Sequence, residues 1–132
     1  MSAKVRPGLC LLTALLLAGC AHFHHPSSPS GIDHLVFVWL KNPGSAKDRR
    51  ALVDTSRELV ATIPQIRSFR WGTAVPSERP IVDDTFDLAL VMNFADRAAL
   101  EQYESHPAHK RAAEEVLRPM TRKVVVYDIE QH

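Results

Sequence analysis

Hydrophobic residues recur from about residue 32 to residue 129 at two spacings, every second position and every third or fourth position, which predict strands and helices respectively. Residues 34–40 form a β-rich run with apolar side chains on both faces, so both faces of this strand are expected to be covered. A helix is expected to begin within residues 45–48, where Ser45 can act as a cap, and to end at Pro64. Its buried stripe comprises Leu52, Val53, Ser56, Leu59, Val60 and Ile63.

Three further strands and a second helical region follow. The strands are predicted at residues 66–75, 85–94 and 123–129. The helical region is predicted at residues 96–118, with Asp96 as its N-cap, a break at Pro107 and an end at Pro119. The resulting order, β-α-β-β-α-β, is that of an α+β, ferredoxin-like fold.

One face of this sheet is expected to lack cover within a single chain, because two helices can cover only one face of a four-stranded sheet. We therefore expect a homodimer, in which a second copy covers the other face. The apolar positions assigned to the uncovered face are Leu35, Phe37 and Trp39 on the first strand, and Phe86, Leu88, Leu90, Met92 and Phe94 on the third.

The composition fits one globular domain. The 132 residues are 45% hydrophobic and 23% charged, which excludes a coiled coil or a wholly disordered chain. The net charge is +1 and no basic stripe stands out, so nucleic acid is not expected as a partner. The sequence contains no HExxH, GxGxxG, P-loop, CxxC or GxSxG motif, so the enzyme classes that carry them lack support and no cofactor is predicted.

The first 31 residues have the features of an export signal followed by a tether. Lys4 and Arg6 precede an apolar run at residues 9–18, and the sequence Leu-Ala-Gly-Cys that ends at Cys20 resembles the lipobox of bacterial lipoproteins. The resemblance implies removal of residues 1–19 and lipidation of Cys20. The following segment, to residue 31, is rich in proline and serine, so residues 20–31 are expected to be the lipidated cysteine and a flexible tether, and residues 32–132 the folded domain. Because Ala21 rather than aspartate follows the cysteine, we expect a lipid-anchored protein of the bacterial cell envelope, on the periplasmic side of the outer membrane in a Gram-negative cell. The alternative is an ordinary secretory signal with an incidental cysteine.

The second helical region carries the candidate chemistry. Tyr103 lies on the inward stripe of its helix, and His109 begins a second inward stripe that continues at Ala112, Ala113 and Val116. If the face of the first strand that bears His34 meets these helices, the three side chains converge in a mostly apolar space. A neutral histidine in such a space can act as a general base. The alternative is that His109 is an ordinary core residue with a satisfied hydrogen bond, and Tyr103 a residue at the rim of the core.

Histidine spacing raises the question of a metal site. His106 and His109 have the i, i+3 spacing of two ligands, and His34 would be a third, but Pro107 breaks the helix that would align them. The tether histidines His22, His24 and His25 lie in a segment without fixed geometry. No metal is therefore predicted.

Four segments together resemble the stress-responsive A/B barrel (Dabb) family. They are His34-Leu-Val-Phe, Ile63-Pro64, Trp71-Gly72 and, most specifically, Tyr103-Glu-Ser-His-Pro-Ala-His109, and the resemblance covers residues 32–129. It implies a homodimeric α/β barrel built by packing two sheets face to face. That expectation agrees with the uncovered sheet face.

Resemblance to a plant polyketide cyclase of this family implies roles for single residues. His109 would be the general base, Tyr103 would assist it, and His34 would line the same pocket together with His106. Asp87 stands where the cyclase has a further pocket histidine. The implied function is binding of a small apolar or aromatic carbonyl compound, with cofactor-free cyclase- or lyase-like turnover if the protein is an enzyme. The alternative is a non-enzymatic stress or envelope lipoprotein that acts through its dimer surface.

Overall fold

The order of strands and helices follows the predicted β-α-β-β-α-β pattern. The computed structural model describes residues 31–132, and residues 1–30, with the predicted signal, Cys20 and nearly all of the tether, lie outside the described part. The elements are β1 (Ile32–Leu40), α1 (Ala46–Thr62), β2 (Ser68–Gly72), β3 (Leu88–Phe94), α2 (Arg97–Ser105), α3 (Pro107–Arg111), the π-helical segment η1 (Ala112–Leu117), α4 (Arg118–Met120) and β4 (Thr121–Glu130). The predicted α+β, ferredoxin-like fold is thus confirmed.

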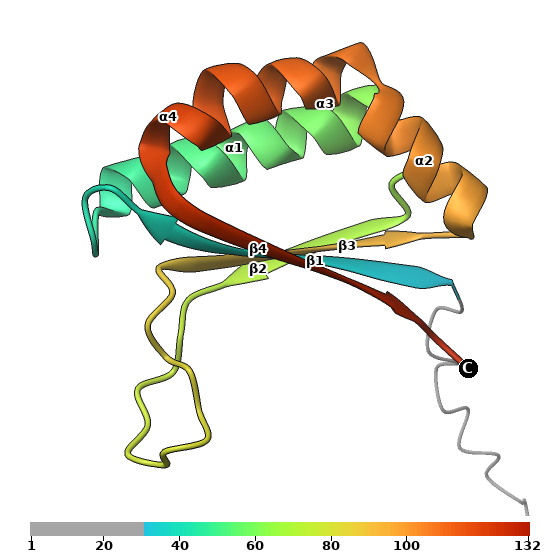
Figure 1. The fold of residues 1–132 in the computed structure, drawn as a ribbon. Helices are drawn as coiled ribbons and strands as arrows, with labels where there is room; N and C mark the ends of the chain where they lie inside the picture. The colour runs from blue at the N-terminus through green and yellow to red at the C-terminus, as the bar shows by residue number, and fades with distance from the viewer. Residues whose placement is uncertain (1–30) are drawn as a thin grey trace, which may run out of the picture.

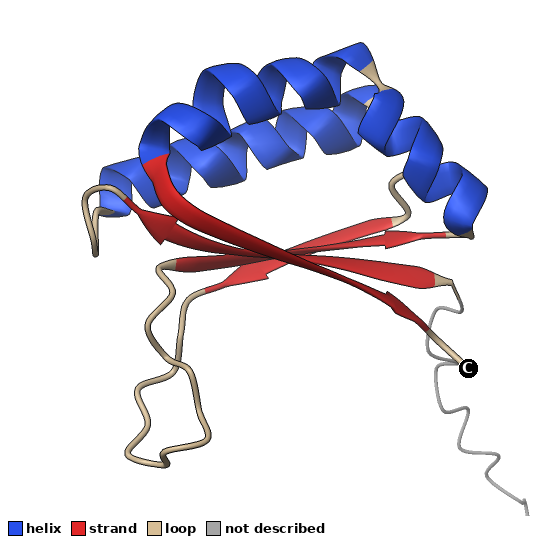
Figure 2. Cartoon of the chain, in the orientation of Figure 1, coloured by secondary structure: helices blue, strands red, loops and turns tan. Residues whose placement is uncertain are grey.

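The strands form one antiparallel sheet in the order β2-β3-β1-β4. All helices lie on one side of it, with α1 beside the chain of short helices that leads into β4 (Figure 1). The loop between β2 and β3 projects from the opposite side (Figure 2). No helix in residues 31–132 is long and apolar enough to cross a membrane.

Capping side chains fix the helix starts as the sequence predicts. The Ser45 hydroxyl accepts a hydrogen bond from the Asp48 amide at 3.2 Å, and the Asp96 carboxylate accepts one from the Ala99 amide at 2.8 Å. α1 ends before Pro64 as predicted. Pro119, by contrast, does not end the last helical stretch, which runs through it to Met120. The wider π-helical turn just before it gives a physical reason, because such a turn relieves the clash of a proline ring with the preceding turn.

β2 and β3 are both shorter than predicted. The later start of β3 changes the face of the sheet on which its apolar residues lie. β3 begins at Leu88 rather than at residue 85, so the alternation of side chains does not run unbroken from Phe86. Phe86 lies against Phe37 and Trp39, with ring centroids 5.0 and 6.3 Å away. The other residues assigned to the uncovered face in that strand lie in the core beneath the helices: Leu88, Leu90, Met92 and Phe94. Their assignment to the uncovered face is wrong, whereas Leu35, Phe37 and Trp39 alternate with core positions of β1 and lie on the face away from the helices.

Candidate functional site

A cavity of about 460 Å³ lies between the helices and the sheet. β1, β3 and β4 supply one side of it, and α1, α2, α3 and η1 supply the other. Most of its lining is aliphatic, from Val36, Leu52, Leu59, Leu90, Met92, Ala112, Ala113, Leu117, Val124 and Val126. Its polar lining residues are His34, Thr55, Ser56, Tyr103, Glu104, His109 and Asp128. An apolar cavity with few polar groups is the usual form of a small-molecule site.

The three residues expected to converge do so in a row of rings. The centroid of the Tyr103 ring lies 4.3 Å from that of His109 and 5.6 Å from that of His34. Phe94 packs beside the row, with its ring centroid 4.9 Å from that of Tyr103 and 6.3 Å from that of His34. The row arises because β1 directs His34 towards the helices, while the inward stripe of α2 directs Tyr103 towards the sheet. Both side chains are buried.

The break between α2 and α3 sets the orientation of His109. The carbonyl of Glu104 would accept the Ala108 amide in an unbroken helix, but His106 Nδ1 accepts that amide instead, at 3.1 Å. His109 Nδ1 lies 3.1 Å from the same Glu104 carbonyl oxygen. Because a carbonyl can only accept, Nδ1 carries the proton and Nε2 keeps its lone pair when the ring is neutral.

Burial lowers the pKa of His109 below its ordinary value of 6.5, and electrostatic interaction with His34 and His106 acts in the same direction. The hydrogen bond to the Glu104 carbonyl only partly opposes this shift of the pKa. His109 is therefore neutral at neutral pH, which is the state that a general base requires.

The pKa of Tyr103 shifts in the opposite direction to that of His109. Burial raises the pKa of its phenol well above the usual range, so the hydroxyl keeps its proton and can donate it in a hydrogen bond. Within the described residues, no hydrogen bond involves the Tyr103 hydroxyl, His34 Nε2 or His109 Nε2. One donor and two potential acceptors thus remain available to a ligand.

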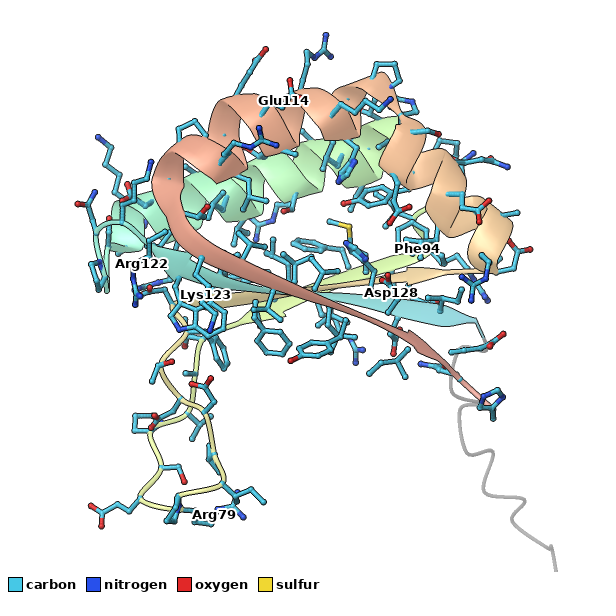
Figure 3. All side chains as sticks on the ribbon, in the orientation of Figure 1. Arg79, Phe94, Glu114, Arg122, Lys123 and Asp128 are labelled. Carbon is cyan, nitrogen blue, oxygen red and sulfur yellow. The ribbon has the colours of Figure 1, made fainter. Side chains whose placement is uncertain are left out.

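Asp128 is a site residue that the sequence interpretation missed. It lies opposite His34 in the pairing of β1 with β4, and its Oδ1 atom lies 2.7 Å from His34 Nδ1. Figure 3 shows Asp128 on β4, the strand that crosses the front of the sheet. A carboxylate in this position accepts the Nδ1 proton, fixes the ring and leaves Nε2 as the free nitrogen. The signal in the sequence is that Asp128 continues the alternation of Val124 and Val126, so a charged residue occupies a helix-facing position.

Two predicted pocket residues lie elsewhere. His106 caps α3 and is absent from the cavity lining. Asp87 lies at the other end of β1, where its carboxylate accepts hydrogen bonds from the Leu40 amide at 2.8 Å and the Gly44 amide at 2.6 Å. Its assignment to the pocket is therefore wrong, because those two backbone amides hold it at the β1–α1 turn. The described residues contain no group of three or more His, Cys, Asp or Glu side chains that could hold a metal ion.

The sequence profile of the Stress Responsive A/B Barrel Domain (Dabb) matches residues 32–131. A solved structure from Arabidopsis thaliana is 24% identical with a TM-score of 0.67, and the match covers 76% of this chain and 95% of that one. Hydroxynitrile lyase from Passiflora edulis is 23% identical with a TM-score of 0.68, over 80% of this chain and 96% of the lyase. No curated protein sequence matches significantly.

Several matched structures are dimers. A dimeric ferredoxin-like protein of unknown function from Thermobifida fusca is 18% identical with a TM-score of 0.60, over 76% of this chain and 90% of that one. Two further bacterial matches are also dimeric. At these identities the likeness to solved structures shows the fold, and the dimeric relatives support a homodimer here.

Proposed function

Because this chain belongs to the stress-responsive A/B barrel (Dabb) domain family, we propose that it binds a small apolar or aromatic carbonyl compound between its helices and sheet and turns it over by general-base chemistry. The observation that carries this proposal is the row of His34, Tyr103 and His109 in a mostly apolar cavity, with three polar atoms left without a protein partner among the described residues. These polar atoms line the cavity and are available to a bound ligand, which can supply the partner that each of them lacks.

His109 and Tyr103 have distinct parts in the proposed reaction. His109 Nε2 takes a proton from the carbon next to the carbonyl, and the electron pair of that C–H bond becomes the second bond of an enolate. Negative charge develops on the carbonyl oxygen, where the Tyr103 hydroxyl donates a hydrogen bond. Return of the proton from His109 to carbon completes the cycle. The residues of the site supply this chemistry without any added group.

The activity named for one relative supports a small substrate derived from a carbonyl compound. The Passiflora protein is a hydroxynitrile lyase, and a hydroxynitrile is the adduct of a carbonyl compound with cyanide. We therefore place lyase-like proton transfer beside cyclase-like proton transfer as the reaction types to test. Both need a neutral base and a hydrogen-bond donor to oxygen, and His109 and Tyr103 would meet those needs.

Hydrogen–deuterium exchange at carbon tests the proposal without knowledge of the natural substrate. The full-length protein is incubated in D₂O with a panel of small aryl alkyl ketones and arylacetaldehydes, all of which carry hydrogen on the carbon next to the carbonyl, and exchange at that carbon is followed by NMR. Mass spectrometry of molecules that co-purify with the protein runs in parallel. Catalysed exchange that is lost in His109→Ala and kept in His132→Ala supports the proposal, because His132 is exposed and lies outside the cavity lining. If neither exchange nor a co-purifying ligand is found, the result favours a non-enzymatic lipoprotein that acts through its dimer surface.

We also propose that lipid on Cys20 holds the protein in the bacterial cell envelope. Support comes from the sequence alone, namely the charged start, the apolar run and the Leu-Ala-Gly-Cys segment. Lipidation of a single cysteine with more than one acyl chain is enough for stable anchoring.

A further inference from the structure

The charged residues that line the cavity are all acidic. Glu104 comes from α2 and Asp128 from β4, and the lining contains neither lysine nor arginine. Anion sites normally use arginine, lysine or a cluster of backbone amides to offset the charge of a carboxylate or phosphate. A negatively charged ligand in this cavity would find no such group among its lining residues.

The two acids lie where a ligand would approach the ring row. Asp128 Oδ1 is 2.7 Å from His34 Nδ1, and the Asp128 side chain remains 43% exposed. Glu104 lines the cavity, and its carboxylate is close enough to raise the pKa of both Tyr103 and His109 by its negative charge. The lining segment of β4 is also open to solvent, because Val124 and Val126 are 37% and 46% exposed. The accessible side of the cavity therefore combines apolar strand residues with negative charge.

The size of the cavity limits the ligand. A cavity of 150 Å³ can hold benzene, so about 460 Å³ has room for a ligand of one or two rings with short substituents. Such a ligand would place any charge within several ångströms of Asp128 or Glu104, a distance at which repulsion between like charges at a protein surface is substantial.

We propose that this cavity selects uncharged carbonyl compounds and rejects carboxylates and phosphates, and that Glu104 and Asp128 determine this specificity. The inference rests on the proposed function, because it concerns the ligand of the same site. It names the class as neutral ketones, aldehydes and esters. Acids, phosphates and substrates attached to phosphate-bearing carriers are excluded.

Two probes that differ only in charge test the inference. Methyl 4-acetylbenzoate and 4-acetylbenzoate share one aromatic ketone, and only the second is an anion at pH 7.5. Dissociation constants are measured by titration calorimetry with the full-length protein, and we expect the ester to bind at least about tenfold more tightly than the acid. Glu104→Gln and Asp128→Asn should each reduce that ratio about threefold or more. The control is Glu114→Gln, which removes the same charge from η1 outside the cavity lining and should leave the ratio unchanged.

The ratio, rather than either affinity alone, decides the result. Asp128→Asn also alters the partner of His34, but that change affects both probes, whereas Glu104→Gln leaves the His34–Asp128 pair intact. Equal binding of the two probes, or tighter binding of the acid, overturns the inference while the proposed function stands. Binding of neither probe, together with absence of carbon exchange across the ketone panel, overturns the proposed function and the inference with it.

Discussion

Replacement of His109 by alanine is the most direct test of the proposed chemistry. The substitution removes the one ring nitrogen that is both free of protein partners among the described residues and held in a fixed tautomer by a backbone carbonyl. Loss of a general base lowers the rate by a factor of about 10² to 10⁴, which corresponds to about 3–5 kcal/mol of transition-state stabilisation. Tyr103→Phe should be milder, because the ring keeps its packing against Phe94 and only the hydroxyl is lost.

The structural cost of the same substitution is smaller. His109→Ala loses one hydrogen bond to the Glu104 carbonyl, worth about 1 kcal/mol, and a ring contact with Tyr103 worth about 0.5–1.5 kcal/mol. A domain of this size ordinarily has about 5–15 kcal/mol of stability, so the variant should remain folded. Circular dichroism checks the fold, and the exchange rate then reports the chemistry.

The pH dependence adds a second signature. Only neutral His109 accepts a proton, and burial lowers its pKa below 6.5, so the wild-type rate should stay level at neutral pH and fall only below the ordinary histidine range. Burial raises the pKa of Tyr103, so no loss of rate is expected as the pH rises towards the ordinary tyrosine range. The assay is the rate of carbon exchange between pH 5 and 9 for wild type, His109→Ala and the control His132→Ala, whose residue lies outside the cavity lining. A His109→Ala rate within about threefold of wild type would refute the general-base role, since loss of a base costs far more.

Three further predictions concern the dimer, the anchor and acid stability. Val91→Asp places a charge on the uncovered face, so light scattering should show a dissociated dimer whose subunits keep their fold. Leu90→Asp, at the adjacent residue of β3, places the charge in the core and should unfold the chain. A Val91→Asp protein that is still a dimer would show that another surface pairs the subunits. Cys20→Ser should abolish incorporation of labelled fatty acid in a bacterial host while residues 32–131 stay folded, and label on the variant would disprove lipidation at this residue. Because burial lowers the pKa of His109, the unfolded chain binds more protons than the folded chain as the pH falls through 6.5. Acidification should therefore lower the free energy of unfolding more in wild type than in His109→Ala. An equal change of this free energy with pH in the two proteins, measured by urea titration, would contradict the prediction.

The sequence was informative about the fold wherever local chemistry decides the structure. Ser45, Asp96 and Pro64 mark helix ends through their own side chains, so these boundaries could be predicted within a few residues. The face of β3 could not be predicted in the same way. A run of apolar residues is compatible with either face, and the choice depends on where pairing with β1 begins, which is a long-range property.

The residues of the candidate site also differ in whether local sequence patterns could place them. His34, Tyr103 and His109 could be brought together from strand and helix periodicity, since each lies on an inward face of its own element. Asp128 could not, because its contact with His34 depends on the register of two strands separated by 94 positions in the chain. Asp87 was misplaced for a related reason. Matching it to a family position gave no information about the amides of Leu40 and Gly44, which bind its carboxylate.

The cavity itself follows from a local irregularity combined with small side chains. The stripe that continues from His109 through Ala112 and Ala113 predicts a packed helix face, but in the structure both alanines line the open space above the sheet. Their methyl groups occupy little of this space, and the π-helical turn that contains them widens the helix at this point. Larger residues there would fill the space and stabilise the core by burying more apolar surface. This chain instead places alanines, a helix break and a histidine with one free ring nitrogen around the same space, and it lacks that additional stabilisation. Such a pattern is expected where an interior is shaped for a ligand rather than for packing alone.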